Sequence, residues 1–139
     1  MPKPGDILLY RKFTFDDGSQ ADKLFIVLNY FDVEKPCITL KTTSQPKHYQ
    51  GCCKGCNRER RCFYAPMDWQ TCFNIDTYIQ LPQIFQFDAA ELLRGGIAGN
   101  IEFLQSSLTS DCLGQLKNCL ATFKDDISQA HWALIYKAK

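Results

Sequence analysis

Four short apolar runs, each bounded by turn-forming residues, constrain the fold of this chain more than any other feature. They occupy residues 5–10, 23–29, 37–40 and 76–81. Each run is rich in Ile, Val, Phe, Leu or Tyr, and Asp-Asp-Gly-Ser, Glu-Lys-Pro and a cysteine-rich loop separate them. Such runs between turn signals are typical of strands. Short strands in this order predict a small β-barrel.

The second half of the chain predicts helices beside a further strand. Asp88 followed by Glu91 is typical of a helix N-cap, and Gly95-Gly96 predicts the end of that short helix. Residues 101–104 alternate in polarity and predict a strand. From Ser110 onward, apolar residues recur at spacings of three and four, which predicts an amphipathic helix, and a shorter helix closes the chain. The expected fold class is mainly β, of the α+β type.

Length and composition predict one compact domain. The chain has 139 residues, of which 45% are hydrophobic and 22% charged. We expect a single domain over residues 1–139, with a cysteine-rich insertion at about 46–75. No stretch of 18 apolar residues occurs, and the N-terminus lacks the apolar stretch of a signal peptide. The expected location is the cytoplasm, without membrane attachment.

The balance of charge limits how nucleic acid can be bound. Sixteen basic and 15 acidic residues give a net charge of +1, so there is no global attraction to a polyanion. Any RNA binding must depend on a local patch, and one patch is evident in the insertion. It consists of Lys47, Lys54, Arg58, Arg60 and Arg61. The alternative interpretation is a solvated loop whose charges keep the chain soluble.

The eight cysteines fall into two groups. Because cytoplasmic thiols are kept reduced, we do not interpret them as a disulfide framework. Cys37, Cys112 and Cys119 lie in predicted strands or on the apolar face of a predicted helix, and we expect them to be small core residues. The remaining five lie between residues 52 and 72.

This second group predicts either a structural zinc site or a reduced, metal-free loop. Cys53 and Cys56 form a Cys-x-x-Cys turn, whose thiolates face one side, and Cys62 with Cys72 completes a tetrahedral set. His48 or Cys52 is a substitute ligand. A metal would stabilise an insertion that otherwise has no predicted structure. A thioredoxin-like redox role for the Cys-x-x-Cys pair is not favoured, because no strand-to-helix context surrounds it.

The order of the motifs resembles the MazF/PemK family of toxin endoribonucleases. The similarity is carried by residues 5–7, 23–28, 38–45 and 76–81 and by the leucine-rich terminal helix. It covers most of the chain apart from residues 46–75. The resemblance implies an SH3-like barrel with a C-terminal helix, a homodimer, single-stranded RNA as substrate and a cognate antitoxin protein as partner. It also implies that catalysis requires no metal.

The resemblance also implies a set of catalytic residues. Thr43, at the end of the third strand, matches the family's Thr, and Lys23 occupies the position of its Arg. Lys41, two residues before Thr43, is on the same face of that strand and supplies a second positive charge. Ser44 and Gln45 join the basic loop residues as expected RNA contacts.

A second function of a different class fits the same residues. The chain is then a catalytically silent module on the same barrel that binds nucleic acid or protein, including a gyrase-binding role of the CcdB type. Lys differs from Arg at a phosphate site because it lacks the rigid bidentate fork. In the simplest interpretation, Lys23 is an ordinary charge at a strand edge and Thr43 is a residue with high β propensity.

Overall fold

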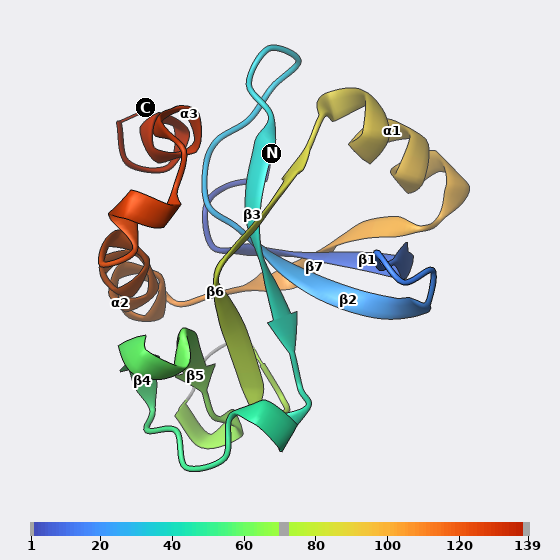
Figure 1. The fold of residues 1–139 in the computed structure, drawn as a ribbon. Coiled ribbons are helices and arrows are strands. Elements are labelled where there is room, and N and C mark those ends of the chain that lie inside the picture. The colour runs from blue at the N-terminus through green and yellow to red at the C-terminus, as the bar shows by residue number, and fades with distance from the viewer. Residues whose placement is uncertain (1, 70–72, 138–139) are drawn as a thin grey trace.

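The computed structural model describes residues 2–69 and 73–137. Within these residues, seven antiparallel strands hydrogen-bond in the order β4-β5-β6-β3-β2-β1-β7 (Figure 1). The strands are β1 (Asp6–Thr14), β2 (Gln20–Val27), β3 (Cys37–Thr43), β4 (Gly55–Asn57), β5 (Cys62–Ala65), β6 (Thr77–Phe87) and β7 (Ile101–Ser107). The predicted α+β chain is confirmed, and each of the four apolar runs overlaps a strand.

Three α-helices occur in the described chain, two of them after β7. They are α1 (Ala89–Ala98), α2 (Ser110–Ala121) and α3 (Gln129–Trp132), and a π-helical turn, η5 (Ala133–Lys137), follows α3. Short 3-10 turns are η1 (Pro46–His48), η2 (Arg58–Arg60), η3 (Met67–Trp69) and η4 (Lys124–Asp126). The predicted helix from Ser110 and the closing helix are both confirmed. No helix in the described ranges has the length and apolar character needed to cross a lipid bilayer.

Both faces of the sheet carry apolar side chains, because alternate residues of a strand point to opposite sides. On one face, Ile26 belongs to the same buried cluster as Leu116 and Leu120 of α2. On the other face, Phe25 clusters with Leu92 of α1. Helices α1 and α2 accordingly lie on opposite sides of β3 and β6 (Figure 1).

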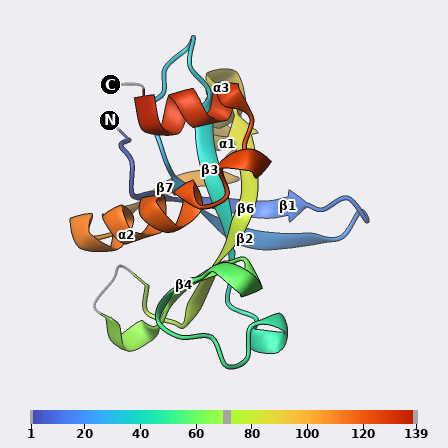
Figure 2. The ribbon, with the colours of Figure 1, turned by 60° about the vertical axis from the view of Figure 1, so that its left-hand side comes forward.

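The insertion is not structureless, which corrects the expectation for residues 46–75. Its strands β4 and β5 pair with each other, and β5 pairs with β6 through Tyr64 opposite Tyr78. Phe63 and Ala65 of β5 are fully buried in the cluster that contains α2. Figure 2 shows the insertion next to α2. The insertion therefore extends the central sheet.

Helix α1 begins as predicted but ends later. The Asp88 carboxylate accepts a hydrogen bond of 2.7 Å from the Glu91 N–H, so the predicted N-cap is confirmed. The helix continues through Gly95 and Gly96, and its C-cap is Gly99 in a left-handed conformation. A Cβ at Gly95 would lie 2.3 Å from the Cδ1 atom of Ile101. Glycine at 95 therefore permits close helix–strand packing and does not end the helix.

Candidate functional site

Two lysines from neighbouring strands converge on one aromatic ring. Lys23 Nζ lies 5.6 Å from the centre of the Phe15 ring, and Lys41 Nζ lies 5.3 Å from the same centre. Phe25 is the cross-strand partner of Lys41, and Lys23 precedes Phe25 by two residues. Both lysines therefore extend from one face of the sheet. The electron-rich face of an aromatic ring attracts such cations.

The environment of these lysines disfavours their positive charge. Both side chains are half-buried. Burial lowers the pKa of Lys23, and the nearby positive charge of Lys41 lowers that pKa further. Burial also lowers the pKa of Lys41, an effect that the Asp16 carboxylate partly opposes. An anion bound between the two ammonium groups would relieve their repulsion, so this arrangement favours a phosphate or a similar ligand.

Thr43 lies on the same strand face as Lys41, two residues further along β3. Its hydroxyl oxygen accepts a hydrogen bond of 3.1 Å from the Gln45 N–H, which fixes the segment leaving the strand. Thr43 and Lys23 line one pocket of about 320 Å³, together with Ser44. Lys41 approaches Lys23 at Phe15. The structure thus brings the three predicted catalytic residues and Ser44 to neighbouring positions.

The rest of this pocket combines apolar and polar groups. Leu9, Leu24 and Ile75 provide apolar surface. The Thr42 hydroxyl donates a hydrogen bond of 2.9 Å to the Leu24 carbonyl oxygen, and the Asp22 carboxylate accepts one of 3.0 Å from the Lys12 N–H. One cation, several hydroxyls and apolar walls in one pocket fit a ligand that has both an anionic and an apolar part, as a nucleotide has.

The predicted RNA-binding loop does not contribute its basic residues to this pocket. The Arg60 guanidinium donates hydrogen bonds to the carbonyl oxygens of Gln50 and His48, so it organises the loop itself. Lys47 is exposed in the middle of η1, and His48 at its end is also exposed. Arg60 therefore has a structural role in the loop.

The other predicted RNA contacts are dispersed over the insertion. Arg61 lies 3.5 Å from the Asp126 carboxylate and 5.1 Å from the centre of the Phe123 ring. Arg58 lines a pocket with Arg61 near the end of α2. Lys54 is directed elsewhere, toward Trp69. The basic residues of the insertion therefore do not form one continuous patch.

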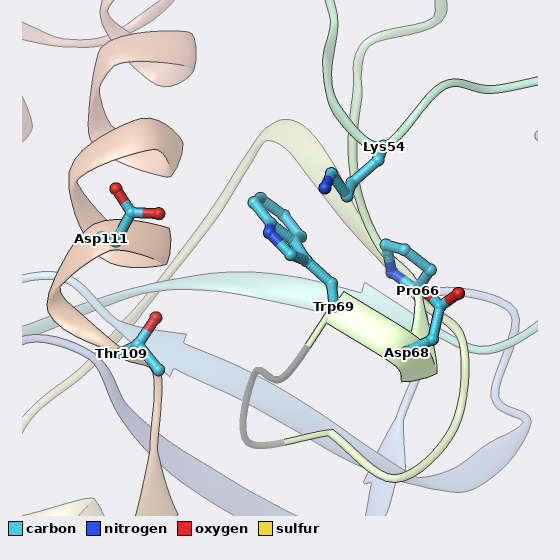
Figure 3. Close-up of a pocket in the computed structure, with 6 residues that line it drawn as sticks. All are labelled: Lys54, Pro66, Asp68, Trp69, Thr109 and Asp111. Carbon is cyan, nitrogen blue, oxygen red and sulfur yellow. The ribbon is translucent and has the colours of Figure 1, made fainter.

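A second pocket, of about 770 Å³, separates the insertion from the start of α2 (Figure 3). Trp69 extends from η3 toward Asp111 on α2 (Figure 3). Lys54 Nζ lies 5.1 Å from the centre of the Trp69 ring. The residues that line this pocket are Lys54, Pro66, Asp68, Trp69, Thr109 and Asp111. Sequence reasoning missed it because its two walls are distant in the chain.

The cysteines differ from the prediction in one decisive respect. Cys56 of β4 and Cys119 of α2 form a disulfide with an S–S distance of 2.06 Å. The expectation that both residues are reduced is therefore wrong for this structure, in which the Cys56 sulfur is bonded to Cys119 and is not a free thiolate. The reason is tertiary: β4 runs beside α2, and Gly55 lies close to Gln115 of that helix.

The other proposed zinc ligands are in unlike environments. Cys53 is exposed, Cys62 is fully buried, and Cys72 lies outside the described residues. Burial, with a smaller contribution from the neighbouring Cys52, raises the pKa of the Cys62 thiol to about 12. In residues 2–69 and 73–137, no group of three or more His, Cys, Asp or Glu side chains is placed to hold a metal ion. The four-cysteine zinc site stays a prediction for a reduced form of the chain, because Cys56 is in a disulfide here.

Sequence reasoning also missed the aromatic residues around the lysines. A bulge in β1 at Lys12, which has a φ of 56°, shifts the register between Tyr10 and Phe13. Tyr10 and Phe13 consequently both contact Phe25, although strict alternation would place them on opposite faces. Phe15 follows on the same face and meets the lysines. A bulge leaves little signal in a single sequence.

Comparison with known proteins gives no family assignment. No protein-family model and no curated protein matches this chain.

Proposed function

We propose that this chain is an endoribonuclease that cleaves single-stranded RNA without a metal ion. The observation that carries the proposal is the convergence of two half-buried ammonium groups, Lys23 and Lys41, on the Phe15 ring, with Lys23 and Thr43 lining one pocket. Burial lowers the pKa of each ammonium group, so both gain from an anionic ligand. The phosphate of an RNA backbone supplies such an anion.

The proposed chemistry uses the ribose 2′-hydroxyl as nucleophile. Its oxygen attacks the adjacent phosphorus, its proton leaves to water, and the 5′-oxygen departs with a proton from water. Lys23 and Lys41 stabilise the negative charge that develops on the phosphorus oxygens, and the Thr43 hydroxyl donates a hydrogen bond to one of them. The product ends in a 2′,3′-cyclic phosphate. DNA lacks the nucleophile and should remain intact.

The proposal extends to the assembly in which the enzyme acts. We assign the sheet to the SH3-like barrel class of the MazF/PemK family and propose that the chain forms a homodimer. The enzyme then acts as the toxin of a type II toxin–antitoxin pair, and its antitoxin covers the groove at Lys23 and Thr43. Light scattering that gives a single 16 kDa species at micromolar concentration would contradict the dimer.

The test is incubation of the purified chain with a long single-stranded RNA in the presence of a chelator. We expect fragments with cyclic phosphate ends. Thr43→Ala and Lys23→Ala should each lower the rate more than tenfold, which corresponds to about 1.4 kcal/mol of transition-state stabilisation. Lys35→Ala, at an exposed turn residue, is the matched control and should retain the wild-type rate.

One observation favours a catalytically silent RNA-binding module as the second candidate. Among the residues that line the Lys23 pocket, none is a histidine or glutamate, and Asp22 already accepts a backbone hydrogen bond. Lys23→Arg separates the two candidates because it restores a bidentate fork. An inert wild type and an inert Arg variant that both still bind RNA would establish the silent module.

A further inference from the structure

The Cys56–Cys119 disulfide joins the insertion to α2 across 63 residues of sequence. One of its two cysteines is exposed to solvent and the other is buried. Cys56 is exposed at the surface of β4, whereas Cys119 is only 3% exposed. An attacking thiol from outside therefore reaches the Cys56 sulfur much more easily than the Cys119 sulfur, which would be the leaving group.

A second thiol lies in the turn that precedes Cys56. The Asn57 side chain closes this turn through both backbone groups of Cys53: it accepts a hydrogen bond of 2.9 Å from the Cys53 N–H and donates one of 2.6 Å to the Cys53 carbonyl. It also donates one of 2.9 Å to the Gly55 carbonyl. Gly55 has a φ of +93°, which a side chain would oppose.

This closed turn holds Cys53 near Cys56. Asn57 is the residue after Cys56 in β4, so these hydrogen bonds tie the backbone of Cys53 to the strand position next to Cys56. Cys53 is exposed and carries a free thiol. The turn thus places an exposed residue with a free thiol three positions before the exposed residue of an existing disulfide.

We propose that Cys53 and the Cys56–Cys119 disulfide form a thiol–disulfide exchange site that moves the bond from between β4 and α2 into the turn. The Cys53 thiol loses its proton to water, and its sulfur attacks the Cys56 sulfur. The Cys53–Cys56 bond forms, the Cys56–Cys119 bond breaks, and the Cys119 sulfur leaves as a thiolate that takes up a proton. One disulfide exists before and after, so no oxidant or reductant is consumed.

The exchange would uncouple the two walls of the larger pocket. Lys54, which lies in the turn itself, and Trp69 form one wall, while Asp111 of α2 lies on the other (Figure 3). While the disulfide joins β4 to α2, these walls are covalently linked. After exchange, only non-covalent packing holds them. The exchange would thus release the insertion from its covalent link to α2, and this inference does not depend on RNA cleavage.

The test follows the alkylation of Cys119 in the full-length protein, purified without reductant. The protein is incubated at about pH 8, where thiolates form, and samples are trapped with N-ethylmaleimide for peptide mass spectrometry. We expect a Cys53–Cys56 cross-linked peptide to appear while Cys119 becomes alkylated. In Cys53→Ser this alkylation should be about tenfold slower, because the attacking sulfur is missing.

Cys52→Ser is the matched control, because it removes the adjacent thiol and leaves Cys53 in place. It should behave as wild type. Equal alkylation of Cys119 in wild type and Cys53→Ser would overturn the proposal, as would slowing by Cys52→Ser alone. Failure to detect a Cys56–Cys119 peptide, even after treatment with excess oxidised glutathione, would overturn it as well. Its presence in Cys53→Ser would show that this variant folds.

Discussion

Strand β3 and the insertion both attach to β6, but different forces hold them. Residues Cys37 to Leu40 of β3 are fully buried between two neighbouring strands. In the insertion, three of the four residues of β5 are buried, whereas the edge strand β4 carries exposed Cys56, which is bonded to Cys119. A central strand is specified by its local apolar pattern. An edge strand depends on bonds to distant parts of the chain.

The largest expected effect tests the Cys56–Cys119 disulfide that holds the edge strand β4. Cys119→Ala removes a cross-link that encloses 63 residues, and chain-entropy arguments predict a loss of about 4 kcal/mol in the free energy of unfolding. Denaturant titration without reductant measures this loss. Wild type with a strong reductant is the internal control, and it should be destabilised to a similar extent. A loss below about 1 kcal/mol would show that packing alone holds the insertion.

The next effect tests the packing of the central strand. Leu40 is fully buried in β3, so Leu40→Ala should lower the free energy of unfolding by about 3 kcal/mol through lost burial and a cavity. Val33→Ala is the control for truncation, because Val33 is 89% exposed. Reductant should not change the Leu40 effect. If Leu40→Ala no longer lowered the free energy of unfolding under reducing conditions, the stability of the central strand would also depend on the disulfide, and the contrast between the two regions would fail.

The sequence predicted the parts of the fold whose signals are local. Strand positions followed from apolar runs, and the α1 N-cap followed from Asp88 and its spacing to Glu91. Strand β4 has only three residues, which is too short for a periodic pattern. Its position depends on pairing with β5 and on Cys119, 63 residues away. A local pattern contains no information about such a distant partner.

The same distinction applies to the candidate site. Strand alternation alone places Lys41 and Thr43 on one face, and their approach to Lys23 follows from the pairing of adjacent strands. The position of Phe15 next to the two lysines depends on the bulge at Lys12. This bulge changes the face of the sheet toward which side chains at the end of β1 point. The predicted basic residues of the insertion do not form one patch, in part because the Arg60 guanidinium donates a hydrogen bond to a carbonyl of its own loop.

A smaller effect distinguishes two adjacent glycines of helix α1, which packs on strand β7 of the sheet. Gly95→Ala would place a methyl group 2.3 Å from Ile101, so it should cost about 1–3 kcal/mol of stability. Gly96→Ala meets nothing closer than 4.0 Å and should stabilise α1 by about 0.5–1 kcal/mol. Thermal unfolding of both variants measures the contrast. Equal effects of the two changes would contradict the close packing of α1 on β7.

The smallest expected effect concerns Lys23 in the central sheet. It tests whether the half-buried positive charge of this lysine lowers the free energy of unfolding. Burial lowers the pKa of this lysine in the folded state, below its ordinary value in the unfolded chain. The folded state therefore penalises the protonated form. This penalty is full below the folded-state pKa of Lys23 and fades as the pH rises from there to the unfolded-state pKa.

Lys23→Met removes the penalised charge while keeping a long apolar stem. It should raise the free energy of unfolding at pH 7 by less than about 1 kcal/mol, because solvent screens a half-exposed charge. The advantage over wild type should shrink at about pH 10, where the unfolded chain also begins to lose the proton. Denaturant titrations at both pH values measure it, and Lys47→Met controls for replacing an exposed lysine. An advantage of the Met variant that grows with pH would reverse the sign of this argument, and it would mean that the site stabilises the charge on Lys23 before any anion binds.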